Sequence, residues 1–298
     1  MQSADFLSAV FFYLKVGENL NQNWIVENLN NAFSTWNGKL GELWGLVTTG
    51  PQTFKGGAVW SVMQTLHNGM VGIGYALVVL FFAISLCKNT MNFHELKRPE
   101  AAIHYFLRFV AAKTLVGYGM DIMLNVFSIC NGIVTDMADS MGGISEAMVS
   151  LPAEMQTAIE NVGFLASIPL WLVTILGSLF ITVLSFVMIL TVYGRMFKLY
   201  MYTAIAPIPL ATFAGEPTQS VGKNFIRSYA GVCLEGAIIA LACIIFSVFA
   251  SSPPTIGDTS LSAVTIVWNY VGELVFNLLV LVGAVKASDR IVKEIMGL

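Results

Sequence analysis

An apolar run of thirty residues, 164–193, contains no charged side chain. A helix rises 1.5 Å per residue, so about 20 residues are enough to cross the ~30 Å hydrocarbon core of a bilayer. Four other apolar runs have about this length and few charges. Run 69–87 has no charged residue, while 114–134, 228–250 and 261–285 hold one acidic residue each. Because a backbone in lipid has to satisfy its own hydrogen bonds, each run is expected to be helical. The sequence therefore predicts an all-α polytopic membrane protein with five transmembrane helices.

The composition excludes an ordinary soluble domain. Of the 298 residues, 56% are hydrophobic and 11% are charged, and the mean hydropathy is +0.73. Soluble domains carry about 25% charged residues, so this chain has too few to solvate its surface. The four cysteines include no C-x-x-C pair, which argues against a disulfide framework or a zinc site. The surface is therefore expected to face a lipid bilayer.

A sixth apolar stretch, 199–215, is interrupted by Pro207 and Pro209. The two prolines remove backbone donors and push the residues before them out of helical geometry. Irregular backbone at membrane depth is tolerated where protein or a water-lined cavity covers it. We therefore expect a re-entrant or interfacial segment here, with the two prolines as a hinge or gate.

Charge placement predicts the topology. With the N-terminus outside, the segments 88–113, 194–227 and 286–298 lie inside and hold 12 basic against 5 acidic residues. The external segments hold 3 basic against 10 acidic residues. Lys and Arg are retained on the cytoplasmic side, so this arrangement is favoured. We expect a multi-pass protein with an external N-terminus and a cytoplasmic C-terminus.

Residues 1–68 are expected to form an external N-terminal region before a membrane domain at 69–298. From Trp24 to Val47 the large apolar residues recur mostly every three to five positions, with Asn and Gln on the other face. This spacing predicts an amphipathic helix. Its apolar face would either lie in the membrane interface or pack against a partner.

The five predicted spans contain three carboxylic acids and no basic residue. A carboxylate at the centre of a membrane helix costs about 2.5–3.5 kcal/mol, so each one needs a reason. Asparagines share a helical face with two of the acids. The candidate membrane-embedded polar residues are Asp121, Asn125, Glu235, Asn269, Glu273 and Asn277.

These polar faces have alternative interpretations. They could hold the helices together, at about 0.6 kcal/mol per hydrogen bond, as could the hydroxyl stripe of the third span at Thr174, Ser178, Thr182 and Ser185. They could instead line a polar lumen or an inter-subunit contact. A proton relay is a third interpretation, and the absence of basic partners in the spans argues against it.

The sequence contains no recognised enzyme motif. His94-Glu95 lacks the second histidine of a metalloprotease helix. The segment Gly117–Asp121 differs by one position from an intramembrane aspartyl protease loop, and a second aspartate in a span is missing. A nucleophile elbow is missing too. We predict a protein that is not an enzyme, with no catalytic residue, cofactor or metal.

An Ala- and Pro-rich break follows a basic turn at the end of the long third run. The turn is Arg195–Tyr200, the break is Thr203–Phe213, and Gly215-Glu216 closes it. In these segments, and in an external N-terminus before five spans, the chain resembles the TrbL-like family. Members of that family are polytopic inner-membrane components of conjugative type IV secretion systems. The external segment 135–163 is shorter than the central loop of many such proteins.

The resemblance implies a structural, channel-forming subunit of a conjugative type IV secretion machine in the bacterial plasma membrane. Such a subunit would form a homo-oligomeric ring with other secretion-system membrane subunits and cytoplasmic ATPases, and would pass or guard DNA or protein. The acidic external loop and buried acids would repel nucleic acid, so contact with translocating DNA is not assigned to them. The cytoplasmic bases could touch substrate, ATPase or anionic lipid: Lys97, Arg98, Arg108, Arg195 and Lys198.

A second function class also stays open. An ion-coupled secondary transporter would use Asp121, Glu235 and Glu273 as its membrane-embedded carboxylates. The missing internal repeat and the missing basic partners argue against this alternative.

Overall fold

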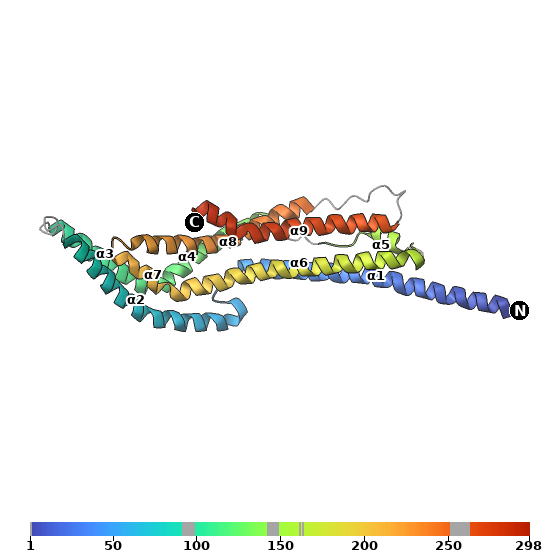
Figure 1. Cartoon of the computed structure of the whole chain (residues 1–298), viewed down its shortest axis with the longest axis horizontal. Helices are drawn as coiled ribbons and strands as arrows, with labels where there is room; N and C mark the ends of the chain where they lie inside the picture. Colours follow the sequence, from blue (N-terminus) through green and yellow to red (C-terminus); the bar gives the residue numbers. More distant parts are fainter. Residues whose placement is uncertain (1, 91–98, 142–148, 161, 163, 251–262) are drawn as a thin grey trace. The chain divides into compact units, whose positions relative to one another are not determined.

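The computed structural model describes residues 2–90, 99–141, 149–160, 162, 164–250 and 263–298. The elements in these ranges are all helical (Figure 1). They are α1 (Gln2–Thr48), the short 3-10 turn η1 (Phe54–Gly57), α2 (Ala58–Thr90), α3 (Pro99–Gly117), α4 (Gly119–Met141), α5 (Ala153–Glu160), α6 (Phe164–Ile205), α7 (Pro207–Ala211), the 3-10 turn η3 (Thr212–Ala214), α8 (Gln219–Ala250) and α9 (Ala263–Met296).

The chain divides into two compact units. The first consists of Met1–Trp44, Met141–Leu190 and Ala242–Lys286. The second consists of Gly45–Ser140, Thr191–Leu241 and Ala287–Leu298. Helices α1, α6, α8 and α9 therefore contribute residues to both units, as does α4 with its last residue.

Within the described ranges, four helices are long and apolar enough to cross a membrane. They are Phe54–Lys88, Ser167–Ile205, Gln219–Phe249 and Val264–Met296. These helices coincide with the first, third, fourth and fifth predicted spans, so the all-α polytopic membrane fold is confirmed. The second predicted span, 114–134, falls on the end of α3 and most of α4, and its crossing of the membrane stays a prediction.

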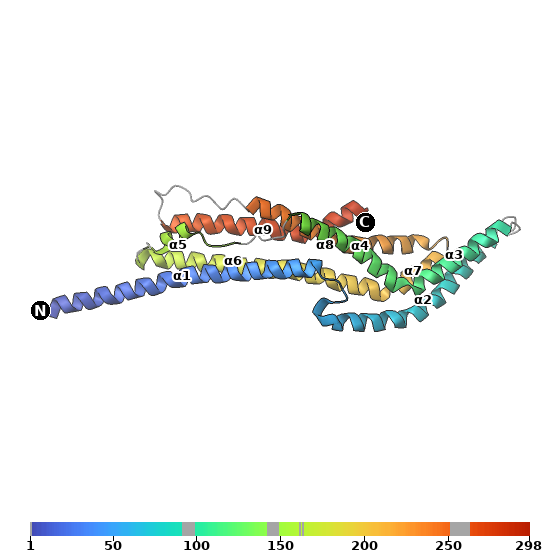
Figure 2. The same cartoon turned by 180° about the vertical axis from the view of Figure 1, so that it is seen from behind.

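In the first unit, α1 packs along α6. The two helices lie side by side in Figure 2, and Trp24 stacks on Trp171 with ring centroids 5.9 Å apart. The Lys39 ammonium lies 5.6 Å from the centroid of the Phe186 ring. Most of the apolar face predicted for this helix is buried, including Leu29, Phe33, Trp36, Leu40 and Leu43, whereas Trp24 is 52% exposed. The chain's own helices cover these side chains, and contact of the exposed part of the face with a membrane interface or a partner stays a prediction.

Helix α9 also packs closely on α6 in the first unit. A Cβ atom added to Gly177 would lie 2.5 Å from Cγ1 of Val271, so the contact depends on the absence of a side chain at 177. Tyr270 is buried on the same side of α9, and its hydroxyl donates a hydrogen bond to the carbonyl of Ser150 at 3.4 Å. These contacts tie α9 and the segment before α5 into one body.

In the second unit, the turn between α1 and α2 is anchored to α6. Residues 55–57 have positive φ angles of 51°, 70° and 80°, and two of them are glycines, which adopt this conformation without a steric penalty. The buried ring of Phe54 packs against Tyr193 and Tyr200, with centroids 5.6 and 6.1 Å away. The Tyr200 hydroxyl donates to the carbonyl of Pro51 at 2.8 Å. The turn thereby fixes where α2 begins.

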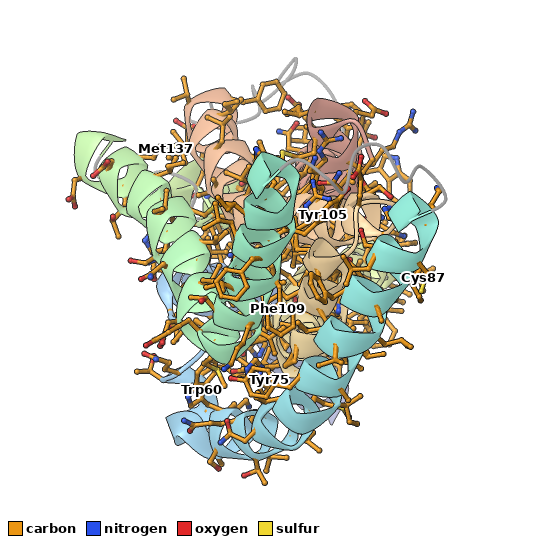
Figure 3. All side chains as sticks on the ribbon, turned by 90° about the vertical axis from the view of Figure 1, so that its left-hand side faces the viewer. Trp60, Tyr75, Cys87, Tyr105, Phe109 and Met137 are labelled. Atoms are coloured by element: carbon orange, nitrogen blue, oxygen red, sulfur yellow. The ribbon has the colours of Figure 1, made fainter. Side chains whose placement is uncertain are left out.

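Helices α3 and α4 meet at a bend flanked by Gly117 and Gly119. A Cβ atom on Gly117 would lie 2.8 Å from the Tyr75 hydroxyl, and one on Gly119 would lie 3.1 Å from Cδ1 of Leu210. Figure 3 shows Tyr75 on α2 and Phe109 on α3 in this part of the second unit. The two glycines therefore allow α2 and α7 to approach the bend.

Candidate functional site

The polar face of α9 points away from the first unit. Asn269 and Glu273 are exposed and Asn277 is half-buried, whereas Val267 and Leu274 on the opposite side are buried. An exposed carboxylate in a membrane helix would meet lipid unless protein or water covers it. This face is therefore available for contacts outside the chain.

Helix α4 of the second unit has the same arrangement. Asp121 and Asn125 are exposed, whereas Met123 and Phe127 are buried against the unit. Two of the three acids predicted in spans thus lie on outward faces of their units.

The hydroxyl stripe of α6 is satisfied within its own helix. Each of its four side chains donates to a carbonyl three or four residues earlier in the chain, over 2.7–2.9 Å. The side chains concerned are Thr174, Ser178, Thr182 and Ser185. A hydroxyl bonded in this way does not need a neighbouring helix as its acceptor.

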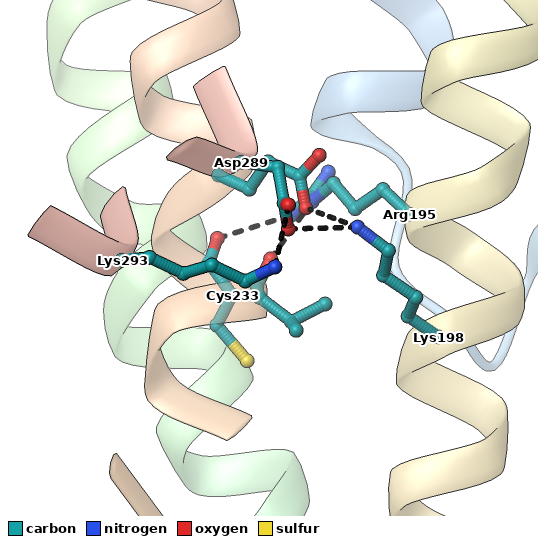
Figure 4. A network of polar contacts seen from close by, with 7 residues as sticks. Arg195, Lys198, Cys233, Asp289 and Lys293 are labelled. Atoms are coloured by element: carbon teal, nitrogen blue, oxygen red, sulfur yellow. Dashed lines mark hydrogen bonds and ion pairs between the residues drawn. The ribbon is translucent and has the colours of Figure 1, made fainter. Parts of the chain in front are cut away.

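Glu235 differs from the other two acids because it is buried, with 2% of its side chain exposed. The Lys198 ammonium lies 3.6 Å from Oε2 of Glu235 and 2.8 Å from Oδ1 of Asp289. Lys293 in turn lies 2.8 Å from Oδ2 of Asp289. Figure 4 shows this network, in which α6, α8 and α9 meet in the second unit.

The expectation that no base is within reach of the embedded acids is wrong for Glu235. Helix α6 does not end with the apolar run at 193 but continues to Ile205. The extra turns carry Lys198 to the side of α8 that presents Glu235.

The ionic network borders a cavity of about 310 Å3 in the second unit. Its polar lining consists of Lys198, Glu235, Asp289 and Lys293 together with Tyr202 and Ser228. Two carboxylates and two ammonium groups balance in formal charge. The lining is therefore polar and has no net formal charge.

Arg195 is buried, with 1% of its surface exposed, and does not belong with the surface bases expected from the sequence. Its Nε and Nη2 donate to the carbonyls of Val232 and Cys233, both at 3.2 Å. Its Cζ lies 5.9 Å from the centroid of the Phe127 ring. Nη1 is buried and has no hydrogen-bond partner among the described residues. Arg195 thus joins α6 to α8 and is not available for substrate or lipid contact.

The other predicted bases have different surroundings. Arg108 forms an ion pair with Glu216, with Nη1 and Oε2 3.3 Å apart, and both side chains are partly exposed. Lys198 belongs to the network around Glu235 and is 37% exposed. Lys97 and Arg98 lie outside the described residues.

The broken segment begins at Pro207, which is buried at the start of α7, where proline is well tolerated. Pro209 is half-buried two residues further along. Nδ1 of the buried His67 on α2 lies 2.7 Å from the carbonyl oxygen of Thr203, near the end of α6. His67 is not among the residues predicted from the sequence, where its only signal is a single imidazole within an apolar run.

Cation-binding side chains do not converge in the described ranges. No group of three or more His, Cys, Asp or Glu side chains there is arranged to hold a metal ion.

Comparison with known proteins gives a family match. The model for the family described as TrbL/VirB6 plasmid conjugal transfer like protein matches residues 36–207. The match covers more than half of the chain and ends at the first proline of the break. No curated protein and no solved structure matches the chain.

Proposed function

Because the chain belongs to the TrbL/VirB6 plasmid conjugal transfer family, we propose that it is a channel-forming inner-membrane subunit of a conjugative type IV secretion machine. The family makes it a component of a conjugal transfer system. The proposal adds a homo-oligomeric ring, contact with other membrane subunits and cytoplasmic ATPases, and a non-catalytic role in passing DNA or protein.

The observation that carries the proposal is the outward polar face of two apolar helices. Asp121 and Asn125 on α4, and Asn269 and Glu273 on α9, are exposed on the single chain. Each carboxylate facing lipid would cost about 2.5–3.5 kcal/mol. Covering these faces with a neighbouring subunit or a water-filled lumen removes that cost, and either arrangement requires assembly.

The proposed topology has the N-terminus outside and the C-terminus in the cytoplasm. The ion pair between Lys198 and Asp289 supports it, because it joins the segments 194–227 and 286–298. Charge bias assigns both segments to the same, cytoplasmic side. In this topology Arg108 and Lys198, with Lys97 and Arg98, are candidates for contact with an ATPase or translocating DNA.

Cysteine accessibility tests the channel assignment. Asn269→Cys and Glu273→Cys would be introduced singly into a chain whose four native cysteines are replaced, with Trp268→Cys and Leu279→Cys as exposed apolar controls on a different side of the same helix. We expect a water-soluble thiol reagent to react differently at 269 and 273 when the other transfer components are co-expressed. Each control should react equally in membranes that contain the other transfer components and in membranes that lack them.

The contrary result is equally clear. If positions 269 and 273 resist the water-soluble reagent, accept a lipid-borne one, and match the two controls in both membranes, this face of α9 meets lipid. The channel assignment would then lose the observation that supports it.

A second candidate function is an ion-coupled transporter, and the pairing of the buried Glu235 with the partly exposed Lys198 favours it. The pair borders the cavity of about 310 Å3 at the meeting point of three helices. Ion flux into proteoliposomes that hold only this chain would support transport if Glu235→Gln abolished it. The absence of flux from the unmodified chain would exclude this function.

A further inference from the structure

A backbone carbonyl in α6 has lost its usual donor. In an α-helix the carbonyl of residue i accepts from the N–H of residue i+4. For Thr203 that residue is Pro207, which has no N–H. Thr203 and Pro207 are both buried, so water is not a ready substitute. A buried carbonyl without a donor is destabilising, so the break needs a donor from elsewhere.

His67 supplies this donor from α2. Its Nδ1 lies 2.7 Å from the Thr203 oxygen, and its side chain is 2% exposed. A carbonyl oxygen only accepts, so Nδ1 has to carry the hydrogen. The ring also lies against the bend between α3 and α4, since a Cβ atom on Gly119 would be 3.5 Å from its Cε1. One imidazole therefore joins α2, α4 and the end of α6.

The contact continues along the same face of α2. Gly74 lies two turns after His67, and a Cβ atom there would be 2.9 Å from the carbonyl oxygen of Pro207. Two further turns on, a Cβ atom on Gly215 would lie 3.0 Å from the carbonyl oxygen of Phe81. Helix α2 thus backs the whole broken segment, and His67 is the first point of attachment.

We propose that His67 is the positioning residue of the proline break, and that its Nδ1–H replaces the backbone donor that Pro207 lacks. The imidazole holds α7 and η3 against α2, so any hinge motion at Pro207 has to move α2 or release this hydrogen bond. The inference deepens the hinge of the proposed channel, but its structural part holds for any membrane function of the chain.

Two variants at position 67 separate the hydrogen bond from the shape of the ring. His67→Asn keeps an amide donor close to the place of Nδ1, and His67→Phe keeps a ring but removes the donor. We expect His67→Phe to lower transfer frequency by about tenfold or more, and His67→Asn to remain within about threefold of the unmodified chain. Equal losses in both variants would overturn the proposal.

A third variant tests the missing donor itself. Pro207→Ala restores the N–H four residues after Thr203, so the helix can bond its own carbonyl. His67→Phe should therefore lower the melting temperature of the purified protein less in the Pro207→Ala background than in the unmodified chain. Equal decreases in the two backgrounds would show that His67 packs in the core without acting on the break.

A spectroscopic measurement on the unmodified chain does not depend on transfer, and it needs a variant only to assign the signal. The chain has three histidines, so nitrogen-15 labelling of histidine gives few signals, and His67→Asn assigns the one from His67. We expect a hydrogen on Nδ1 of His67. A ring that carries its only hydrogen on Nε2 would contradict the inference. If the chain proved to have no role in conjugation, this spectroscopic result and the melting temperatures would not change. The proposed channel function and the proposed role of His67 can therefore fail separately.

Discussion

The guanidinium of Arg195 occupies the space that a side chain on residue 236 would need. A Cβ atom added to Gly236 would lie 2.5 Å from Cζ and 2.7 Å from Nη1 of Arg195. The absence of a side chain lets the guanidinium lie flat on α8 and reach the carbonyls of Val232 and Cys233. A small residue on one helix thus makes room for a buried charge from another.

Gly236→Ala should therefore destabilise the protein. The new methyl group displaces the guanidinium, breaks two charge-assisted hydrogen bonds and leaves a cation buried, at a cost of about 2–4 kcal/mol. Gly194→Ala is the matched control, because Gly194 is next to Arg195 in α6 and has open space around its Cβ position. Thermal unfolding in detergent should show a clear loss for the first variant and little change for the second. Equal melting temperatures would mean that Arg195 can move aside freely.

Much of the membrane fold could be predicted from the sequence because long apolar runs have few alternatives in lipid. The end of α6 could not, since Arg195 and Lys198 interrupt the apolar pattern but not the helix. A basic residue can lie inside a buried helix when acidic side chains or carbonyl groups pair with it. In this chain those partners are far away in the sequence. Lys198 and Asp289 are 91 residues apart.

The candidate site shows the same limit. The sequence reveals that Pro207 leaves a carbonyl without a donor, and it shows a lone histidine in an apolar helix. His67 and Thr203 are 136 residues apart, so no local periodicity connects them. The outward direction of Glu273, in contrast, follows from a four-residue repeat once the buried side of α9 is known.

Lys198→Met should destabilise the protein because Glu235 loses its ion-pair partner. The carboxylate would stay buried without its ion-pair partner, at a cost of about 1–3 kcal/mol, below the value for fully buried pairs because Lys198 is partly exposed. In a Glu235→Gln background, Lys198→Met should lower the free energy of unfolding by less, since no buried charge is left unpaired. A double-mutant cycle on melting temperature measures the coupling.

Lys293→Met is the control for that cycle. Lys293 pairs with Asp289 but is 57% exposed, so its removal should cost under about 1 kcal/mol. Additive effects of the substitutions at 198 and 235 would mean that their ion pair contributes nothing to stability.

Asn37→Ala should loosen α1 from the first unit. The Asn37 amide donates to the carbonyl of Val149 at 2.8 Å and accepts from the N–H of Val149 at 2.9 Å. Loss of both bonds leaves two backbone groups of a connecting segment unsatisfied, at about 1–2 kcal/mol. Limited proteolysis should then cut α1 or the segment before α5 faster. Asn31→Ala, on an exposed position of the same helix, should leave the cleavage rate unchanged.

Glu273→Leu should affect the stability of the purified chain and the activity of the assembled machine in opposite directions. Removing a carboxylate from an outward membrane face lowers the cost of insertion by about 2.5–3.5 kcal/mol, so the purified chain should be at least as stable as before. If the face covers a neighbouring subunit or lines a lumen, transfer frequency should nevertheless fall by about tenfold or more. Leu279→Val, on a different side of α9 and 49% exposed, should change neither quantity. Unchanged transfer with Glu273→Leu would show that the carboxylate has no role outside the chain, because its only remaining effect would be the cost it imposes on the helix.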